Sequence, residues 1–159
     1  MQAAKYMNKL NIYEELKLKE YYWGGALRVS FEKIDLHSTS NVINILDEVC
    51  KSEGLNGLNE DWNEIDYNLF KKILLSSFQF NLGFSNSEQM PAEKAQWYYN
   101  AAIENLNMET CRCFTNWHNN PWDQGGGGGG FSVSKHTLDL ALSIINNSEM
   151  LFVYFLFED

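Results

Sequence analysis

Two segments of the chain have the hydrophobic patterns of β-strands. Residues 26–34 alternate between apolar and polar side chains, and this period of two predicts a half-buried strand. Its apolar side consists of Leu27, Val29 and Phe31. Residues 150–157 are apolar on both faces, which is typical of a strand covered on each side. We expect the two strands to lie next to each other.

Helical spacing of apolar residues follows the first strand. The hydroxyls of Ser38, Thr39 and Ser40 are suitable N-caps for a helix that runs to about Ser52. Gly54 stands where a C′ residue is expected. The apolar stripe of this helix consists of Val42, Ile45, Leu46, Val49 and Cys50.

Two more helices are predicted in the middle of the chain. The first begins at a cap formed by Asn59 or Asp61 and ends near Phe78, because apolar residues recur there at three- and four-residue spacing. The second has Pro91 in its first turn, where proline is favoured, and continues to about Leu106.

Three further elements complete the predicted topology. Residues 6–16 have helical spacing of apolar residues, and residues 111–117 favour a strand over a continuation of the preceding helix. Ser132 or Ser134 caps a last predicted helix that ends at Asn146. The apolar stripe of this helix consists of Leu138, Ala141, Leu142 and Ile145.

The pattern as a whole predicts an α+β fold. About four or five helices pack on a small two- or three-stranded sheet, which is too small for a doubly wound α/β architecture. At 159 residues, we expect one globular domain over residues 1–159, with a flexible glycine loop at residues 124–130.

Composition and charge narrow the function. The chain is 45% hydrophobic, which argues against disorder, yet it carries a formal charge of −9. Such a surface repels phosphate backbones and anionic membranes, so we expect no direct nucleic-acid or membrane binding and a basic protein as partner. Three cysteines, an odd number, and the absence of an apolar signal core at the start favour a soluble cytoplasmic protein with free thiols.

The residue types of common catalytic and metal sites occur without the required context. Six consecutive glycines, 125–130, follow no strand and precede no Lys-Ser/Thr, so they predict a linker rather than a nucleotide site. Cys111, Cys113 and His118 are metal-ligand types, but their spacing is wrong and a fourth ligand is missing. Cys50 lies on an apolar helical stripe and has no histidine near it in sequence. We therefore expect no catalytic residue, metal or cofactor.

One acidic segment is the candidate site. Residues 54–110 contain eight acids and three bases, so more than half of the net charge falls there. Acids at a helix start also stabilise the helix dipole, which is the alternative explanation. As a partner-binding surface, carboxylates steer a basic protein and an aromatic residue supplies an anchor. The candidate residues are Glu60, Asp61, Trp62, Glu64, Asp66 and Tyr67.

In general character the chain is similar to the immunity proteins of bacterial toxin systems, which are small, acidic and aromatic-rich. The resemblance implies an inhibitor of a basic toxin, such as a nuclease, and assigns no residue role. Three alternatives stay open: a phage-encoded inhibitor that mimics nucleic acid to block a host defence complex, an enzyme whose site is assembled from scattered residues, and a structural or oligomerisation module. Trp117 and Trp122 belong either to the core or to a second contact surface.

Overall fold

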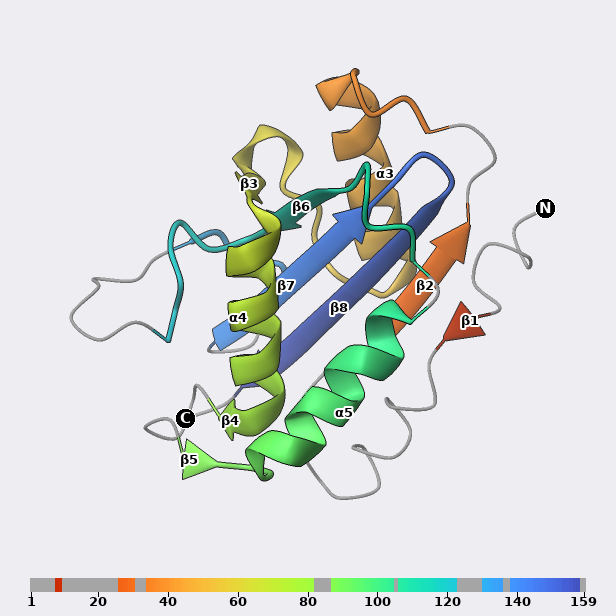
Figure 1. Cartoon of the computed structure of the whole chain (residues 1–159). Coiled ribbons are helices and arrows are strands. Elements are labelled where there is room, and N and C mark those ends of the chain that lie inside the picture. The colour runs from red at the N-terminus through yellow and green to blue at the C-terminus, as the bar shows by residue number, and fades with distance from the viewer. Residues whose placement is uncertain are drawn as a thin grey trace.

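The computed structural model describes residues 8–9, 26–30, 34–81, 87–104, 106–122, 130–135 and 138–157. Their largest element is a six-stranded antiparallel sheet with the strand order β1-β2-β8-β7-β6-β3 (Figure 1). Four strands form its body: β2 (Ala26–Ser30), β8 (Glu149–Phe157), β7 (Leu138–Ile145) and β6 (Arg112–Thr115). Short strands flank them, β1 (Asn8–Lys9) and β3 (Asn63–Ile65), and a separate pair consists of β4 (Phe80–Asn81) and β5 (Ser87–Glu88).

The described residues contain three α-helices: α3 (Thr39–Ser52), α4 (Tyr67–Gln79) and α5 (Ala92–Ile103). The α+β class is confirmed, but the prediction of four or five helices on a small sheet is wrong. The helix predicted over residues 6–16 lies outside the described residues, apart from the two residues of β1. The glycine loop predicted at residues 124–130 also lies outside them, except for Gly130.

The last predicted helix is a strand. Residues 138–145 form β7, which pairs with β8 over its whole length, from Leu138 opposite Phe157 to Ile145 opposite Met150. Apolar residues recur in this segment at both helical and strand spacing, so the local pattern fits either structure. Pairing with β8 on one side and β6 on the other decides in favour of the strand.

The second predicted helix starts later than expected. Asn59–Asp61 form a single 3₁₀ turn, η1, and β3 follows before α4 begins. The cap of α4 is Asp66, whose side chain accepts a hydrogen bond from the backbone N–H of Leu69 at 2.8 Å. Asn59 and Asp61 are therefore not the caps of this helix.

Several local predictions are confirmed. Ser38 caps α3 by accepting from the N–H of Asn41, and Gly54 has a φ of 76° just beyond the helix. β6 and β8 are strands, and β2 pairs with β8, with Leu27 opposite Phe152.

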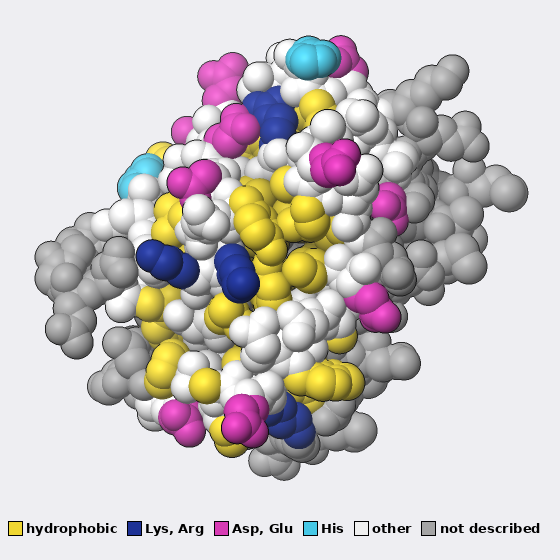
Figure 2. Space-filling view, in the orientation of Figure 1, with side chains coloured by type: hydrophobic (Ala, Val, Ile, Leu, Met, Phe, Trp, Pro, Cys, Tyr) yellow, Lys and Arg dark blue, Asp and Glu magenta, His cyan; other side chains and the backbone are white. Residues whose placement is uncertain are grey.

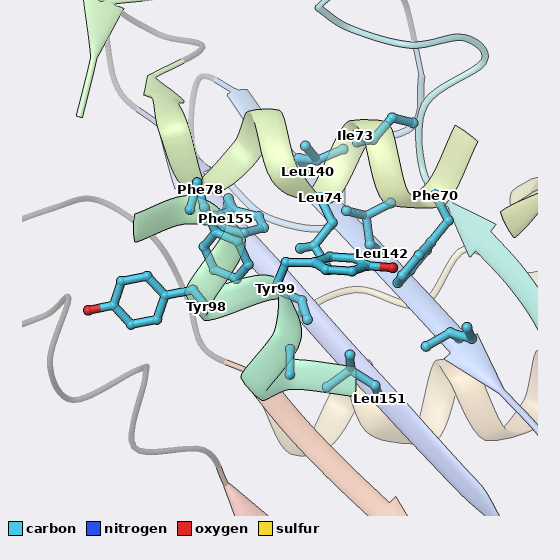
Figure 3. Packing of buried hydrophobic residues seen from close by; sticks show 14 of the residues in the cluster. Phe70, Ile73, Leu74, Phe78, Tyr98, Tyr99, Leu140, Leu142, Leu151 and Phe155 are labelled. Atoms are coloured by element: carbon cyan, nitrogen blue, oxygen red, sulfur yellow. The ribbon is translucent and has the colours of Figure 1, made fainter. Parts of the chain in front are cut away.

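Helices cover both faces of the sheet. α4 and α5 lie side by side in front of it, and α3 lies behind (Figure 1). Beneath α4 and α5 is a mainly apolar layer in which Phe78 meets Phe155 edge to face at 5.5 Å (Figure 3). Other members of this layer are Phe70, Leu74, Tyr99, Leu140, Leu142 and Leu151. The expectation that β8 is covered on both sides is thus confirmed.

The α3 face is covered by one helix and by two loops. Leu55 and Leu58 come from the loop after α3, and Val133 comes from the loop before β7. The N–H of Asn56 donates to the carbonyl of Val133 at 2.7 Å, so the two loops are joined.

A buried carboxylate holds the second of these loops. Asp139 of β7 is 4% exposed. Its Oδ1 accepts from Asn116 Nδ2 (2.9 Å) and from the N–H of Val133 (3.1 Å). Its Oδ2 accepts from the N–H and the hydroxyl of Ser134, at 3.0 and 2.6 Å. These four bonds satisfy a charge that would be costly to bury alone.

Candidate functional site

Four of the predicted site residues follow one another along the β3 edge of the sheet. Glu60 and Asp61 are in η1, Glu64 is in β3, and Asp66 caps α4. All four side chains are exposed, and we call them the acidic edge. In Figure 2 acidic side chains gather at the upper left, over β3 and β6 of Figure 1.

A buried carboxylate fixes η1 from below. Asp47 of α3 accepts from the N–H of Leu58 at 2.9 Å, from the N–H of Asn59 at 3.1 Å and from the indole N–H of Trp62 at 2.9 Å. Gly57 passes so close that a Cβ there would lie 2.6 Å from the Asp47 carboxyl carbon. The backbone that presents Glu60 is thus held at both ends of the turn.

An ion pair fixes Glu64. Arg112 of the neighbouring strand β6 donates from Nε to Oε2 at 2.8 Å and from Nη2 to Oε1 at 2.6 Å, the two-pronged geometry that guanidinium favours with carboxylate. Arg112 also donates from Nη1 to the carbonyl of Leu36 at 2.6 Å. Hydrogen bonding to Arg112 holds the pKa of Glu64 below its usual range and raises that of Arg112.

The two aromatic residues of the predicted site are not exposed anchors. Trp62 is 6% exposed and lies edge to face with Phe152 in the core of the α3 face. Tyr67 is half-buried, stacks on Phe70 and shares a short hydrogen bond with the hydroxyl of Tyr99. Trp62 therefore supports the acidic edge through Asp47 and is not available as an aromatic contact.

Exposed aromatic residues occur elsewhere. Among the described residues, the large exposed hydrophobic side chains are Trp97, at 59%, and Phe131, at 40%. Trp97 lies on α5 outside the stripe that contains Tyr98 and Ala102, and its helical phase is the signal that predicts its exposure. Trp97, Asn100, Ala101 and Glu104 line an open hollow of about 400 Å³.

Trp117 and Trp122 are both half-buried and pack against the α4/α5 layer. The indole N–H of Trp117 donates to the carbonyl of Asp139 at 2.8 Å, and Trp122 meets Phe80 with ring centroids 6.1 Å apart. These contacts favour a place in the core over a second contact surface.

The cysteines and His118 form no metal cluster. No group of three or more His, Cys, Asp or Glu side chains with metal-binding geometry occurs in the part of the chain that is described. His118 is exposed and contacts the ring of Phe131. Cys50 is buried, and burial raises its pKa to about 12 with help from the nearby charges of Asp47 and Asp139. A thiol in that state is a poor nucleophile at neutral pH.

None of the helices in the described ranges has the length and apolar character needed to cross a membrane. Comparisons with known protein families, curated proteins and solved structures find nothing that matches this chain.

Proposed function

We propose that the protein is an inhibitor that binds a basic protein partner in the cytoplasm through its acidic edge. In this proposal it is an immunity protein, and the partner is a toxin, most simply a nuclease. The acidic edge carries the proposal: four exposed carboxylates fall within the seven residues 60–66, and the backbone beneath them is fixed.

Fixed carboxylates suit tight and fast binding. Because Asp47 anchors η1 and Asp66 caps α4, little conformational freedom is left to lose when a partner docks. A net charge of −9 attracts a basic protein over a distance limited by salt screening. Nucleases present basic surfaces to phosphate, and carboxylates placed there block substrate by occupying the same positive groups.

Within the described residues, Glu60 and Asp61 make no ion pair, whereas Glu64 is held by Arg112. We therefore assign Glu60 and Asp61 to direct contact with basic side chains of the partner. Glu64 has a structural role in the acidic edge. To bind a cation of the partner, its carboxylate would first have to give up the two-pronged hydrogen bond to Arg112.

The partner is obtained by pull-down from the native host, or by co-expression with the product of the gene directly upstream. The test variant carries Glu60→Gln, Asp61→Asn, Glu64→Gln and Asp66→Asn, which removes four charges from −9 and leaves −5. We expect a slower association rate and a weaker dependence of that rate on salt, measured by surface plasmon resonance at several ionic strengths.

A matched control keeps the same net charge. Four other exposed glutamates, changed to glutamine, also leave −5: Glu88, Glu93, Glu104 and Glu109. The control retains most of the association rate if the acidic edge is the contact. Equal losses in the two variants would show that net charge alone acts, and an unchanged test variant would overturn the proposal.

A further inference from the structure

Two cysteines lie two positions apart at the start of β6, beside the acidic edge. Cys111 precedes β6 and Cys113 is in it, two positions apart, so both side chains point to the α4/α5 face. Burial raises the pKa of Cys113, and the nearby thiol of Cys111 raises it further. Cys111 is half-buried and also donates to the carbonyl of Met108 at 3.3 Å, whereas Cys113 is 2% exposed.

We propose that Cys111 and Cys113 are a reactive dithiol that a small-molecule disulfide of the glutathione type oxidises to an intramolecular disulfide. The thiolate of Cys111 attacks one sulfur of the small disulfide, which forms a mixed disulfide and releases one thiolate. Cys113 then loses its proton and attacks Cys111 Sγ, which releases the second thiolate. Two electrons pass to the small disulfide, and the two cysteine protons go to the released thiolates.

The environment of each thiol assigns these roles. Cys111 is the one that a solvent-borne disulfide reaches. Burial raises the pKa of both thiols, but the neighbouring Cys113 side chain and the backbone partly lower that of Cys111. For Cys113, the charges of Cys111, Asp66 and Glu64 raise the pKa further. Cys111 is therefore the attacking thiol and Cys113 the resolving thiol, and oxidation is slow at neutral pH.

The backbone permits closure with a local bend. Two steps along a strand cover about 6.6 Å, at the upper end of the Cα separations found in disulfides. The ladder between β6 and β7 begins with Arg112 opposite Ile145, so Cys111 lies just outside it. Cys111 can move toward Cys113 without loss of its own ladder pair, but the bend then falls on Arg112.

Arg112 connects the dithiol to the acidic edge. Its side chain points to the opposite face, where it holds Glu64 and the carbonyl of Leu36. A bend at residue 112 draws the guanidinium away from β3 and releases Glu64. This consequence matters for function only if the proposed inhibitor role is correct, whereas the disulfide chemistry does not depend on that role.

The chemistry is tested on the full chain without any partner. The folded protein is incubated with oxidised glutathione and analysed by intact mass and peptide mapping. We expect the wild type to lose two hydrogens, to retain no glutathione and to keep Cys50 reduced. Cys113→Ser is expected to trap glutathione on Cys111, and Cys111→Ser is expected not to react.

Contrary results are equally clear. The proposal is overturned if the wild type stays reduced or keeps glutathione on Cys111. It is also overturned if Cys50 is modified together with Cys111, because that result would indicate reaction through unfolding. Cys113→Ala serves as a second variant if Cys113→Ser does not fold, because alanine adds no polar group to the core.

The link to the acidic edge has its own readout. Amide hydrogen exchange at Glu64 and Ile65 is compared between reduced and oxidised protein. We expect exchange about fivefold faster after oxidation, from loss of the ion pair. Unchanged exchange in a protein that does form the disulfide would refute the link and leave the dithiol chemistry intact. Neither test measures partner binding, so a failure of the proposed inhibitor function would be detected in separate experiments.

Discussion

The two faces of the central sheet are covered in different ways. On one face, α4 and α5 lie side by side over a layer of apolar side chains. On the other face, α3 covers part of the sheet and loops cover the rest. Both buried carboxylates of the described residues, Asp47 and Asp139, hold these loops.

This difference follows from hydrogen bonding. A helix satisfies most of its own backbone N–H groups, so two helices can close a face mainly with apolar side chains. A loop that covers a core brings N–H groups without partners, and each needs an acceptor. Asp47 supplies acceptors for Leu58 and Asn59, and Asp139 supplies them for Val133 and Ser134. Glu60 and Asp61 of the acidic edge lie in one of these loops, the one that Asp47 holds.

Among these predictions, removal of the Asp139 carboxylate is expected to cause the largest loss of stability. Asp139→Ala removes the carboxylate that accepts hydrogen bonds from Val133, Ser134 and Asn116, and we expect a loss of about 4 kcal/mol in the free energy of unfolding. Urea denaturation measures this loss. Glu48→Ala, an exposed change on α3, is the control. A loss for Asp139→Ala as small as that of the control would mean that this loop does not depend on its carboxylate.

The helix-covered face should respond instead to the truncation of a buried apolar side chain. Leu142 is fully buried beneath α4 and α5. Leu142→Ala is expected to cost about 3 kcal/mol through the cavity it leaves. Native-state hydrogen exchange of the Leu142→Ala variant in mild denaturant adds a second measurement. The amides of Val133 and Leu58 should still exchange only through global unfolding of the protein. Preferential deprotection of those loop amides would show that the two faces are not independent.

A smaller loss of stability is expected when one hydrogen bond beneath the acidic edge is removed. Trp62→Phe keeps most of the ring but removes the N–H that donates to Asp47, and we expect a loss of about 2 kcal/mol. Trp97→Phe makes the same chemical change at a side chain that is 59% exposed and should cost less than about 0.5 kcal/mol. Thermal unfolding of both variants gives the comparison, and similar losses would argue against the role of Asp47 as an anchor.

The smallest expected effect is a pH dependence of the free energy of unfolding. The pKa of Glu64 is lowered in the folded protein by its hydrogen bond to Arg112, so the pair stabilises the fold above the ordinary glutamate pKa. This stability is lost as the pH falls through the lower folded value. With the Glu64 side chain 49% exposed, the contribution should be below about 1 kcal/mol.

Glu64→Gln should therefore be slightly less stable than wild type near neutral pH and equal to it in acid, below the folded pKa. Denaturation curves at several pH values from acid to neutral show the convergence. A difference that grows toward acid pH would contradict the assigned sign.

Local chemistry was enough to predict some elements, but not those with two possible periods. The caps of α3 are set by Ser38 and Gly54, residues adjacent to the helix itself, and β8 is apolar on both faces because of its own residues. β7 fits a helix and a strand equally well, and only its pairing with β8 and β6 separates them. Asn59 and Asp61 resemble caps, but Asp47, twelve positions before Asn59, holds that segment in a turn.

The same distinction applies to the candidate site. The acidic character of residues 60–66 can be read directly from the sequence, because charge is a property of each residue. Only tertiary contacts show that Trp62 is buried, that Arg112 holds Glu64 and that Cys111 and Cys113 both face the α4/α5 layer. Burial and pairing depend on neighbours that are distant in sequence, such as Asp47 for Trp62 and Arg112 for Glu64, and no local pattern contains those neighbours.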